Sequence, residues 1–305
     1  MTRIIWALQA AVFYLLTWVI ALLPSEVSNR LGARIGLLMV RLLPSRWKIA
    51  VDNIRQALPY MAVSPLWKYP TTDPEEIARQ TFINIGRSLA EICRLYHGRA
   101  ATLIDNLEVR GREYHDAARA RGKGVIFLTG HCGNWELVAL AYSRLFRSPL
   151  SVVARRQNNP YLNRMVEKMR LQYDNRIIYK DNALRSMIAV IRKNGAVGLL
   201  ADQAARPDEG ARIPFLGRMA WASKAPVLVA RKTGVPILPS FIHREGDRHV
   251  LTFHPECLFS DDAGDAGLQE NIKRYSETME RFIIAHPADW YWVHRRWKRA
   301  GEVLP

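Results

Sequence analysis

The sequence predicts an α/β fold with a mostly parallel central sheet and helices on both faces. From Gly122 onward, short apolar runs alternate with stretches of helical periodicity. This order is typical of parallel strands joined by helices. Earlier in the chain, an uncharged apolar run leads into a region with helical spacing only. We therefore expect an N-terminal membrane helix and a helical region before the α/β part.

The N-terminal run, Ile4–Leu23, carries no charge, and only Gln9 and Thr17 interrupt its apolar character. As a helix it would be about 30 Å long, enough to cross the hydrocarbon core of a bilayer. A cleaved signal peptide is the alternative. The run is long for that role, and the following "LLPSEVSNR" offers no cleavage site between small residues. We therefore expect a retained anchor.

A second apolar stretch, Leu31–Pro44, follows directly, with Arg34 and Arg41 seven residues apart. Two arginines at this spacing share one face of a helix, as in helices that lie in the membrane surface. A hairpin-like or interfacial arrangement therefore stays open beside a spanning one. We assign residues 1–44 to the anchor.

The region 45–121 is predicted to be helical and to form the first part of a catalytic domain, 45–305. One helix is expected from Ser45 to Pro59, and another inside Thr71–Tyr96, where Asp73 is a suitable N-cap and Pro74 takes the first helical position. A stripe at helical spacing in the second helix is assigned to the core. It consists of Ile77, Phe82, Ile85, Leu89 and Ile92.

The α/β part, 122–305, alternates predicted strands and helices. The strands are Gly124–Thr129, Leu150–Ala154, Arg176–Tyr179, Ala196–Ala201, Pro236–His243 and His249–Phe253. The helices are Trp135–Phe146, Tyr161–Tyr173, Ala183–Lys193, Ser223–Thr233 and Gly267–Ala285. The last two strands are separated by "REGDR" and are predicted to form a hairpin.

The composition limits the classes of binding partner that the protein can have. A formal net charge of +16 is compatible with nucleic acid, an anionic membrane or a merely solvated basic surface. The apolar N-terminus favours the membrane, because a basic body beside an anchor is attracted to anionic headgroups. No nucleic-acid-binding motif is present in the sequence. The three widely spaced cysteines, Cys93, Cys132 and Cys257, favour neither a disulfide framework nor a metal cluster and fit a reducing compartment.

The sequence "GVIFLTGHCGNWE" places His131 where a predicted strand ends, with Glu136 in the first turn of the next helix. Active groups collect at the carboxyl ends of strands in open α/β sheets. A carboxylate beside an imidazole can hold it in one tautomer and stabilise its protonated form. The pair would then activate a hydroxyl of a second substrate. The alternative is a packed turn histidine and a glutamate that complements the helix N-terminus.

The motif "GHCGNWE" resembles that of the lipid A biosynthesis acyltransferases, a branch of the lysophospholipid acyltransferase-like group with an H-x4-D/E motif. Further blocks resemble the same family in the same order over essentially the whole chain. They are "INIGRSLAEI", "VVARRQNNPYLN", "NALRSMIAVIRKNGAVGLLADQ", "IPFLGRMAWAS", "ARKTGVPILPSF" and "WYWVHRRWK".

The resemblance implies a glycerolipid acyltransferase-like fold and an O-acyltransferase in the bacterial inner membrane that faces the cytoplasm. The acyl donor would be an acyl carrier protein thioester, and the acceptor an anionic glycolipid, a lipid A precursor. His131 would be the general base and Glu136 the acid that orients it. Arg155 would hold developing negative charge, together with backbone N–H groups of the turn. No metal, cofactor or nucleic acid is implied.

Other residues are candidates for substrate binding, each with a structural alternative. Arg156 adjoins Arg155 in what could equally be a solvated basic loop. Asp202 follows another predicted strand and could instead cap a turn. Asn134 stands between the two motif residues.

Two apolar segments also leave alternatives open. Pro214–Gly217 fits either an acyl groove or an apolar turn packed on the core. The aromatic and basic segment Trp290–Lys298 suits a membrane interface or a terminal element paired with acids of the body.

Four other functions compete with lipid A acylation. The acceptor could be a lysophospholipid, an ornithine lipid or a mannosylated inositol lipid. The chain could be a non-catalytic lipid-binding protein, a slow thioester hydrolase or a nucleic-acid binder. A serine esterase is disfavoured, because the sequence lacks a G-x-S-x-G motif.

Overall fold

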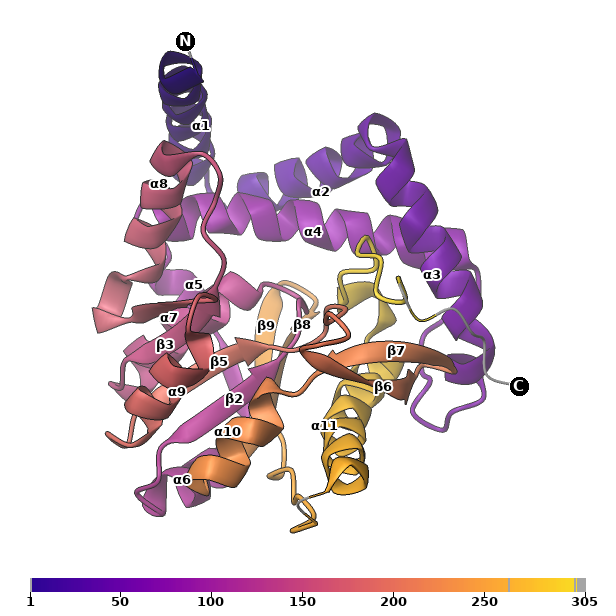
Figure 1. Ribbon diagram of the computed structural model, residues 1–305. Coiled ribbons are helices and arrows are strands. Elements are labelled where there is room, and N and C mark those ends of the chain that lie inside the picture. Colours follow the sequence, from indigo (N-terminus) through magenta and orange to yellow (C-terminus); the bar gives the residue numbers. More distant parts are fainter. Residues whose placement is uncertain (1, 263, 299, 301–305) are drawn as a thin grey trace.

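A seven-stranded, mostly parallel sheet lies between helices at the centre of the protein, which confirms the predicted fold class (Figure 1). The structure is a computed structural model that describes residues 2–262, 264–298 and 300. The last part of the expected catalytic domain, 301–305, lies outside the described residues.

The elements follow the chain in this order. The helices are α1 (Thr2–Leu22), α2 (Ser25–Leu42), α3 (Pro44–Ala62), α4 (Pro74–Tyr96), α5 (Ala101–Asp105), α6 (Arg112–Ala120), α7 (Trp135–Phe146), α8 (Pro160–Arg170), α9 (Ala183–Ile191), α10 (Ala225–Thr233) and α11 (Asp265–Ala285), with 3-10 turns η1 (Gln172–Asp174) and η2 (Pro287–Asp289). The strands are β1 (Glu108–Arg110), β2 (Val125–Thr129), β3 (Leu150–Ala154), β4 (Arg176–Tyr179), β5 (Ala196–Leu200), β6 (Gly210–Phe215), β7 (Arg218–Ser223), β8 (Ile237–Glu245) and β9 (Arg248–Phe253).

The large sheet has the strand order β1-β9-β8-β2-β5-β3-β4. Strands β8, β2, β5, β3 and β4 run parallel, and β9 returns antiparallel to β8 as the predicted hairpin. The carboxyl ends of the five parallel strands therefore meet at one edge of the sheet. Any polar residue that directly follows one of them is brought to this edge.

The sequence did not predict β1, α6 or the separate β6–β7 hairpin. The hairpin turn is made by Leu216 and Gly217, both in the left-handed region with φ of 49° and 72°. A leucine rarely adopts this conformation, so the usual hairpin sequence is missing. The predicted end of a helix at Pro59 was also wrong, because α3 continues to Ala62. Met61 in its last turn is fully buried, and this packing outweighs the hydrogen bond that the proline removes.

Helices cover both faces of the sheet. Side chains along β2 point alternately to the two faces of the sheet, since the neighbours Ile126 and Phe127 belong to different hydrophobic clusters. Helices α9, α10 and α11 contribute to the cluster that contains Ile126, and α5, α6 and α7 contribute to the cluster that contains Phe127. The candidate site lies where these two layers meet the helical region.

Helices α2 and α4 lie side by side across one end of the α/β body (Figure 1). Three glycines allow this close approach. A Cβ atom on Gly36 would stand 2.2 Å from the carbonyl oxygen of Phe82, and one on Gly86 would stand 2.1 Å from that of Gly32. Close backbone contact of this kind fixes α2 on the body.

Helix α1 projects away from the body (Figure 1). Its C-terminal part packs on α4, and nearer its N-terminus Asn159, the residue before α8, donates a hydrogen bond to the carbonyl of Trp6 (3.2 Å). Within the described ranges, α1 is the one helix that is long and apolar enough to cross a membrane. Only 17% of its most apolar window is buried by the rest of the protein. An apolar helix left so exposed in water would be unfavourable, which is a sign of membrane association.

Candidate active site

His131 and Asp202 form a hydrogen-bonded pair at the carboxyl edge of the sheet. His131 follows β2 and Asp202 follows β5, and the register of these adjacent strands pairs Thr129 with Leu200. The Nδ1 atom of His131 lies 2.8 Å from Oδ1 of Asp202, and the backbone N–H of His131 donates to Oδ2 (3.0 Å). Because the carboxylate accepts from Nδ1–H, Nε2 keeps its lone pair and can accept a proton.

The turn that carries His131 is clamped by the last residue of η2 and by the two residues that follow it. The N–H of Gly133 donates to the carbonyl of Asp289 (2.7 Å), and the N–H of Tyr291 donates to that of His131 (3.0 Å). Gly133 has a φ of +49°, and a Cβ atom there would meet the carbonyl oxygen of Ile242 at 2.6 Å. Glycine is therefore required at this position. The indole N–H of Trp290 completes the clamp by donating to Oδ2 of Asp202 (2.9 Å).

The electrostatics of the pair favour an ionised Asp202 and a basic His131. Burial by itself lowers the pKa of His131, but the charge and hydrogen bond of Asp202, helped by the charge of Glu136, raise it above its usual value. Burial would raise the pKa of Asp202, yet the charge of His131 and its hydrogen bonds lower that pKa to about 2. The His131 side chain is 21% exposed while that of Asp202 is 3% exposed, so solvent and substrate reach only the imidazole.

Glu136 does not hold the imidazole by a hydrogen bond, which corrects the expectation that it orients His131. Both of its carboxylate oxygens accept from the guanidinium of Arg170 on α8, with Nε 2.9 Å from Oε2. Its influence on His131 is through charge, because it raises the pKa of the imidazole. The physical reason is the direction of α7: Glu136 lies in its first turn and faces α8, whereas Asp202 reaches Nδ1 from the adjacent strand.

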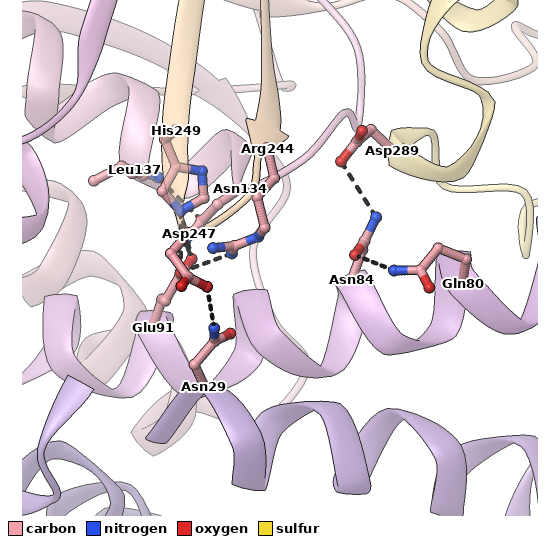
Figure 2. A network of polar contacts seen from close by, with 10 residues as sticks. All are labelled: Asn29, Gln80, Asn84, Glu91, Asn134, Leu137, Arg244, Asp247, His249 and Asp289. Carbon is pink, nitrogen blue, oxygen red and sulfur yellow. Dashed lines mark hydrogen bonds and ion pairs between the residues drawn. The ribbon is translucent and has the colours of Figure 1, made fainter. Parts of the chain in front are cut away.

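Asn134 is buried and belongs to a structural network, so the expectation that it contacts substrate does not fit its position. Its side-chain oxygen caps α7 by accepting from the N–H of Leu137 (3.2 Å), and its Nδ2 donates to Glu91 (2.8 Å) (Figure 2). Glu91 also accepts from Arg244 (2.7 Å) and is hydrogen-bonded to His249 (2.9 Å). Both functional ends of the amide are thus used inside the protein.

Arg155 and Arg156 are both exposed on the loop after β3, and β3 is separated from β2 by β5. The guanidinium of Arg156 stacks over the ring of Tyr179, 4.1 Å from its centroid. The backbone N–H groups expected to help Arg155 are otherwise engaged. Those of His131, Cys132 and Gly133 donate to Asp202, Gly130 and Asp289, respectively.

Residues that the sequence reasoning missed surround the imidazole. The ring centroid of Trp135 lies 5.0 Å from that of His131, and the ring of Tyr291 lies 6.0 Å away. The amide Nε2 of Gln203 lies 3.3 Å from Nε2 of His131. The position of Gln203 directly after Asp202 could have indicated it.

The aromatic segment Trp290–Lys298 is largely part of the core, which contradicts the membrane-interface interpretation for its tryptophans. Trp290, Trp292 and Trp297 are buried, and the buried guanidinium of Arg296 stacks on the ring of Phe215 at 4.7 Å. In the same way, Phe215 and Leu216 of the "PFLG" turn pack in the core. The interpretation of Pro214–Gly217 as an apolar turn packed on the core therefore holds.

Two cavities are each lined by an aromatic ring that contacts the imidazole. The larger, about 310 Å³, lies between the helical region and the C-terminal segment. It is lined by Met39, Leu43, Arg46, Phe82, Ile85, Tyr291, Val293 and His294. The smaller, about 40 Å³, lies between the sheet and α7 and has almost entirely apolar walls. Tyr291 lines the first cavity and Trp135 the second, and both rings contact the imidazole of His131.

A basic imidazole held by a buried carboxylate keeps one ring nitrogen that can accept a proton. Residues 3–299 match the family model of the bacterial lipid A biosynthesis acyltransferases, and the chain belongs to this family. The resemblance seen in "GHCGNWE" and the other blocks is thereby confirmed. Acyl transfer is the activity class that this membership carries.

Curated relatives agree with the family. Over 94% of this chain and 90% of the relative, the sequence is 24% identical to a lipid A biosynthesis lauroyltransferase of Escherichia coli. A lipid A biosynthesis myristoyltransferase of the same organism is 21% identical over 94% of this chain and 86% of its own length. A phosphatidylinositol mannoside acyltransferase of Mycobacterium tuberculosis is 24% identical over 75% of this chain and 72% of its own.

Proposed function

We propose that the protein moves a fatty acyl chain from an acyl carrier protein thioester to a hydroxyl of a lipid A precursor. The observation that carries this proposal is the His131–Asp202 pair, whose partly exposed imidazole contacts Trp135 and Tyr291, and each of these rings lines a cavity. The names of two relatives, a lipid A lauroyltransferase and a lipid A myristoyltransferase, support the proposed acceptor.

In the proposed reaction, Nε2 of His131 takes the proton of the acceptor hydroxyl as its oxygen attacks the thioester carbonyl carbon. Asp202 stabilises the imidazolium that forms. The new C–O bond gives a tetrahedral intermediate. Its collapse breaks the C–S bond, and the proton on His131 passes to the departing thiolate, so an ester and a free carrier thiol result. Glu136 supports the charged imidazole from a greater distance, and the amide of Gln203 positions the reacting groups.

The cavities suggest how two lipids reach one base. We assign the larger cavity to the acceptor, because it adjoins α2, whose Leu37, Leu38 and Leu42 are exposed apolar side chains. The narrow apolar cavity beside Trp135, about 40 Å³, suits the first few atoms of the donor's acyl chain. Arg155 and Arg156, on an exposed loop, would contact the acidic carrier protein or a phosphate of the acceptor.

We further propose that residues 1–44 anchor the protein in the bacterial inner membrane and that residues 45–305 form the catalytic domain on the cytoplasmic side. The support is the exposed apolar helix α1 and the net charge of +16. A basic body is drawn both to anionic headgroups and to an acidic carrier protein. The similarity to a phosphatidylinositol mannoside acyltransferase favours one second candidate, a mannosylated inositol lipid as acceptor.

The test uses the full chain in detergent, a radiolabelled acyl carrier thioester and three acceptors. These are a tetra-acylated lipid A precursor, a mannosylated phosphatidylinositol and a lysophospholipid. We expect label on the lipid A precursor with the unaltered protein, and a loss of about 10²- to 10⁴-fold in His131→Ala. Transfer to another acceptor would replace the proposed substrate. Transfer that His131→Ala leaves intact would overturn the mechanism.

A further inference from the structure

The small cavity between the sheet and α7 contains two hydroxyl groups without partners. Thr129 on β2 and Ser240 on β8 both line it, and their side chains are buried, with 8% and 1% of the residue surface exposed. Within the described part of the chain, neither hydroxyl has a hydrogen-bond partner. Buried hydroxyls are nearly always paired, so a polar atom is expected to occupy this cavity.

The two hydroxyls are neighbours and lie close to the catalytic base. Leu128 pairs with Pro239 across β2 and β8, so Thr129 and Ser240, the next residue on each strand, stand side by side. Thr129 precedes His131 by two residues, so their Cα atoms are at most about 7 Å apart. Trp135 connects the cavity to the imidazole. The hydroxyls therefore lie where the first carbons of a chain would pass if its carbonyl stood at His131.

The remaining walls of the cavity are apolar, and its volume of about 40 Å³ holds only a few atoms. A volume of this size has room for roughly three water-sized groups. A plain methylene chain in this space would leave both hydroxyls buried and unpaired, which is unfavourable. A chain with a hydroxyl of its own could donate to one and accept from the other.

We propose that Thr129 and Ser240 select a donor chain that carries a hydroxyl near its thioester end. The inference rests on the proposed acyl transfer and specifies its donor class. The substituent takes no part in the chemistry: the same C–O bond forms, the same C–S bond breaks, and the hydroxyl on the chain is transferred unchanged.

The test compares carrier thioesters of dodecanoic, 2-hydroxydodecanoic and 3-hydroxydodecanoic acid with the acceptor that the unaltered protein uses. We expect one hydroxylated donor to be preferred by about tenfold or more in kcat/KM, because a site built to pair a hydroxyl rejects the analogue without it. Thr129→Val and Ser240→Ala should each reduce this ratio severalfold. Ser276→Ala on α11 is the matched control, since this buried hydroxyl donates to the carbonyl of Ile272 outside the cavity.

The outcomes separate this inference from the proposed function. Equal rates with all three donors, as a cavity filled by water would give, overturn the inference and leave acyl transfer standing. A preference that neither Thr129→Val nor Ser240→Ala reduces also overturns it. Transfer from none of the donors overturns both proposals. The inference is supported if the ratio of kcat/KM for the hydroxylated and plain donors falls in both cavity variants and not in Ser276→Ala. This ratio compares two donors on the same protein sample, so it does not depend on the folded fraction.

Discussion

Among the described residues, two histidines are paired with a buried carboxylate, Asp202 or Glu91, and the two imidazoles differ in what they can still do. At the edge of the sheet, Asp202 bonds to Nδ1 of His131, and Nε2 lies 3.3 Å from the amide nitrogen of Gln203 without a carboxylate partner. Where β9 meets α4, Nε2 of His249 lies 3.0 and 2.9 Å from the two oxygens of Glu91 (Figure 2). The His249 side chain is 2% exposed, against 21% for His131.

The difference shows that a histidine beside a carboxylate is not by itself a catalytic site. Glu91 is also bound by Arg244 and Asn134, and it joins α4 to β8, β9 and the start of α7. The charges of His249 and Arg244 overcome the effect of burial and lower the pKa of Glu91 to about 2. This pair is closed and structural, whereas the His131 pair leaves one nitrogen accessible for a proton.

The largest expected effect comes from Asp202→Asn. An amide can donate to Nδ1 and so place the proton on Nε2, which removes the base. We expect kcat/KM to fall by about a thousandfold or more. The residual activity should also change its pH dependence. Activity needs a neutral His131, so in the unaltered protein it rises with pH through the raised pKa of this residue. Without the carboxylate, burial lowers the pKa of His131. The rise of activity on the acid side of the pH profile (the acid limb) then moves below the usual 6.5.

Asp208→Asn is the control for this variant, because Asp208 is an exposed acid in the loop that follows Asp202. The measurement is a pH profile of kcat/KM for both variants and the unaltered protein. An acid limb that stays in place in Asp202→Asn would mean that another group sets the pH dependence.

The second prediction concerns the closed pair. Glu91→Ala leaves the guanidinium of Arg244 buried without its carboxylate, and we expect a loss of about 3–5 kcal/mol in the free energy of unfolding. Glu270→Ala, which breaks an exposed pair with Arg274, should cost about 0.5 kcal/mol or less. Denaturant unfolding measures both. Specific activity per folded molecule should survive in Glu91→Ala, and a selective loss of activity would give the closed pair a role in catalysis.

The sequence predicted the sheet and the position of His131 at a strand end because their patterns are local. Alternating apolar runs indicate strands, and the glycines around His131 indicate a tight turn after one of them. The partner of the histidine could not be chosen in this way. Glu136 is five residues away in sequence, while Asp202 is brought to Nδ1 only because β5 pairs with β2, and strand order is a property of the whole fold.

The C-terminal segment shows the same limit. Its aromatic and basic composition suits a membrane interface, yet Trp290 is buried and donates to Asp202, and Tyr291 forms one wall of the site. Asn134 was missed as a structural residue for a related reason. Its partner Glu91 is 43 positions earlier, and no local pattern connects the two.

The smallest effect is expected for Glu136→Gln, because Glu136 reaches His131 only through its charge. We expect kcat/KM to fall by about tenfold or less, since one pKa unit corresponds to about 1.4 kcal/mol. The acid limb should move to lower pH, but less than in Asp202→Asn. Arg170→Gln and the double variant complete the measurement. If Glu136 acts as one half of its pair with Arg170, the double variant will lose less than the sum of the two single changes. Additive losses, or a loss as large as that of Asp202→Asn, would return to Glu136 the direct role on the imidazole that the H-x4-E spacing first indicated.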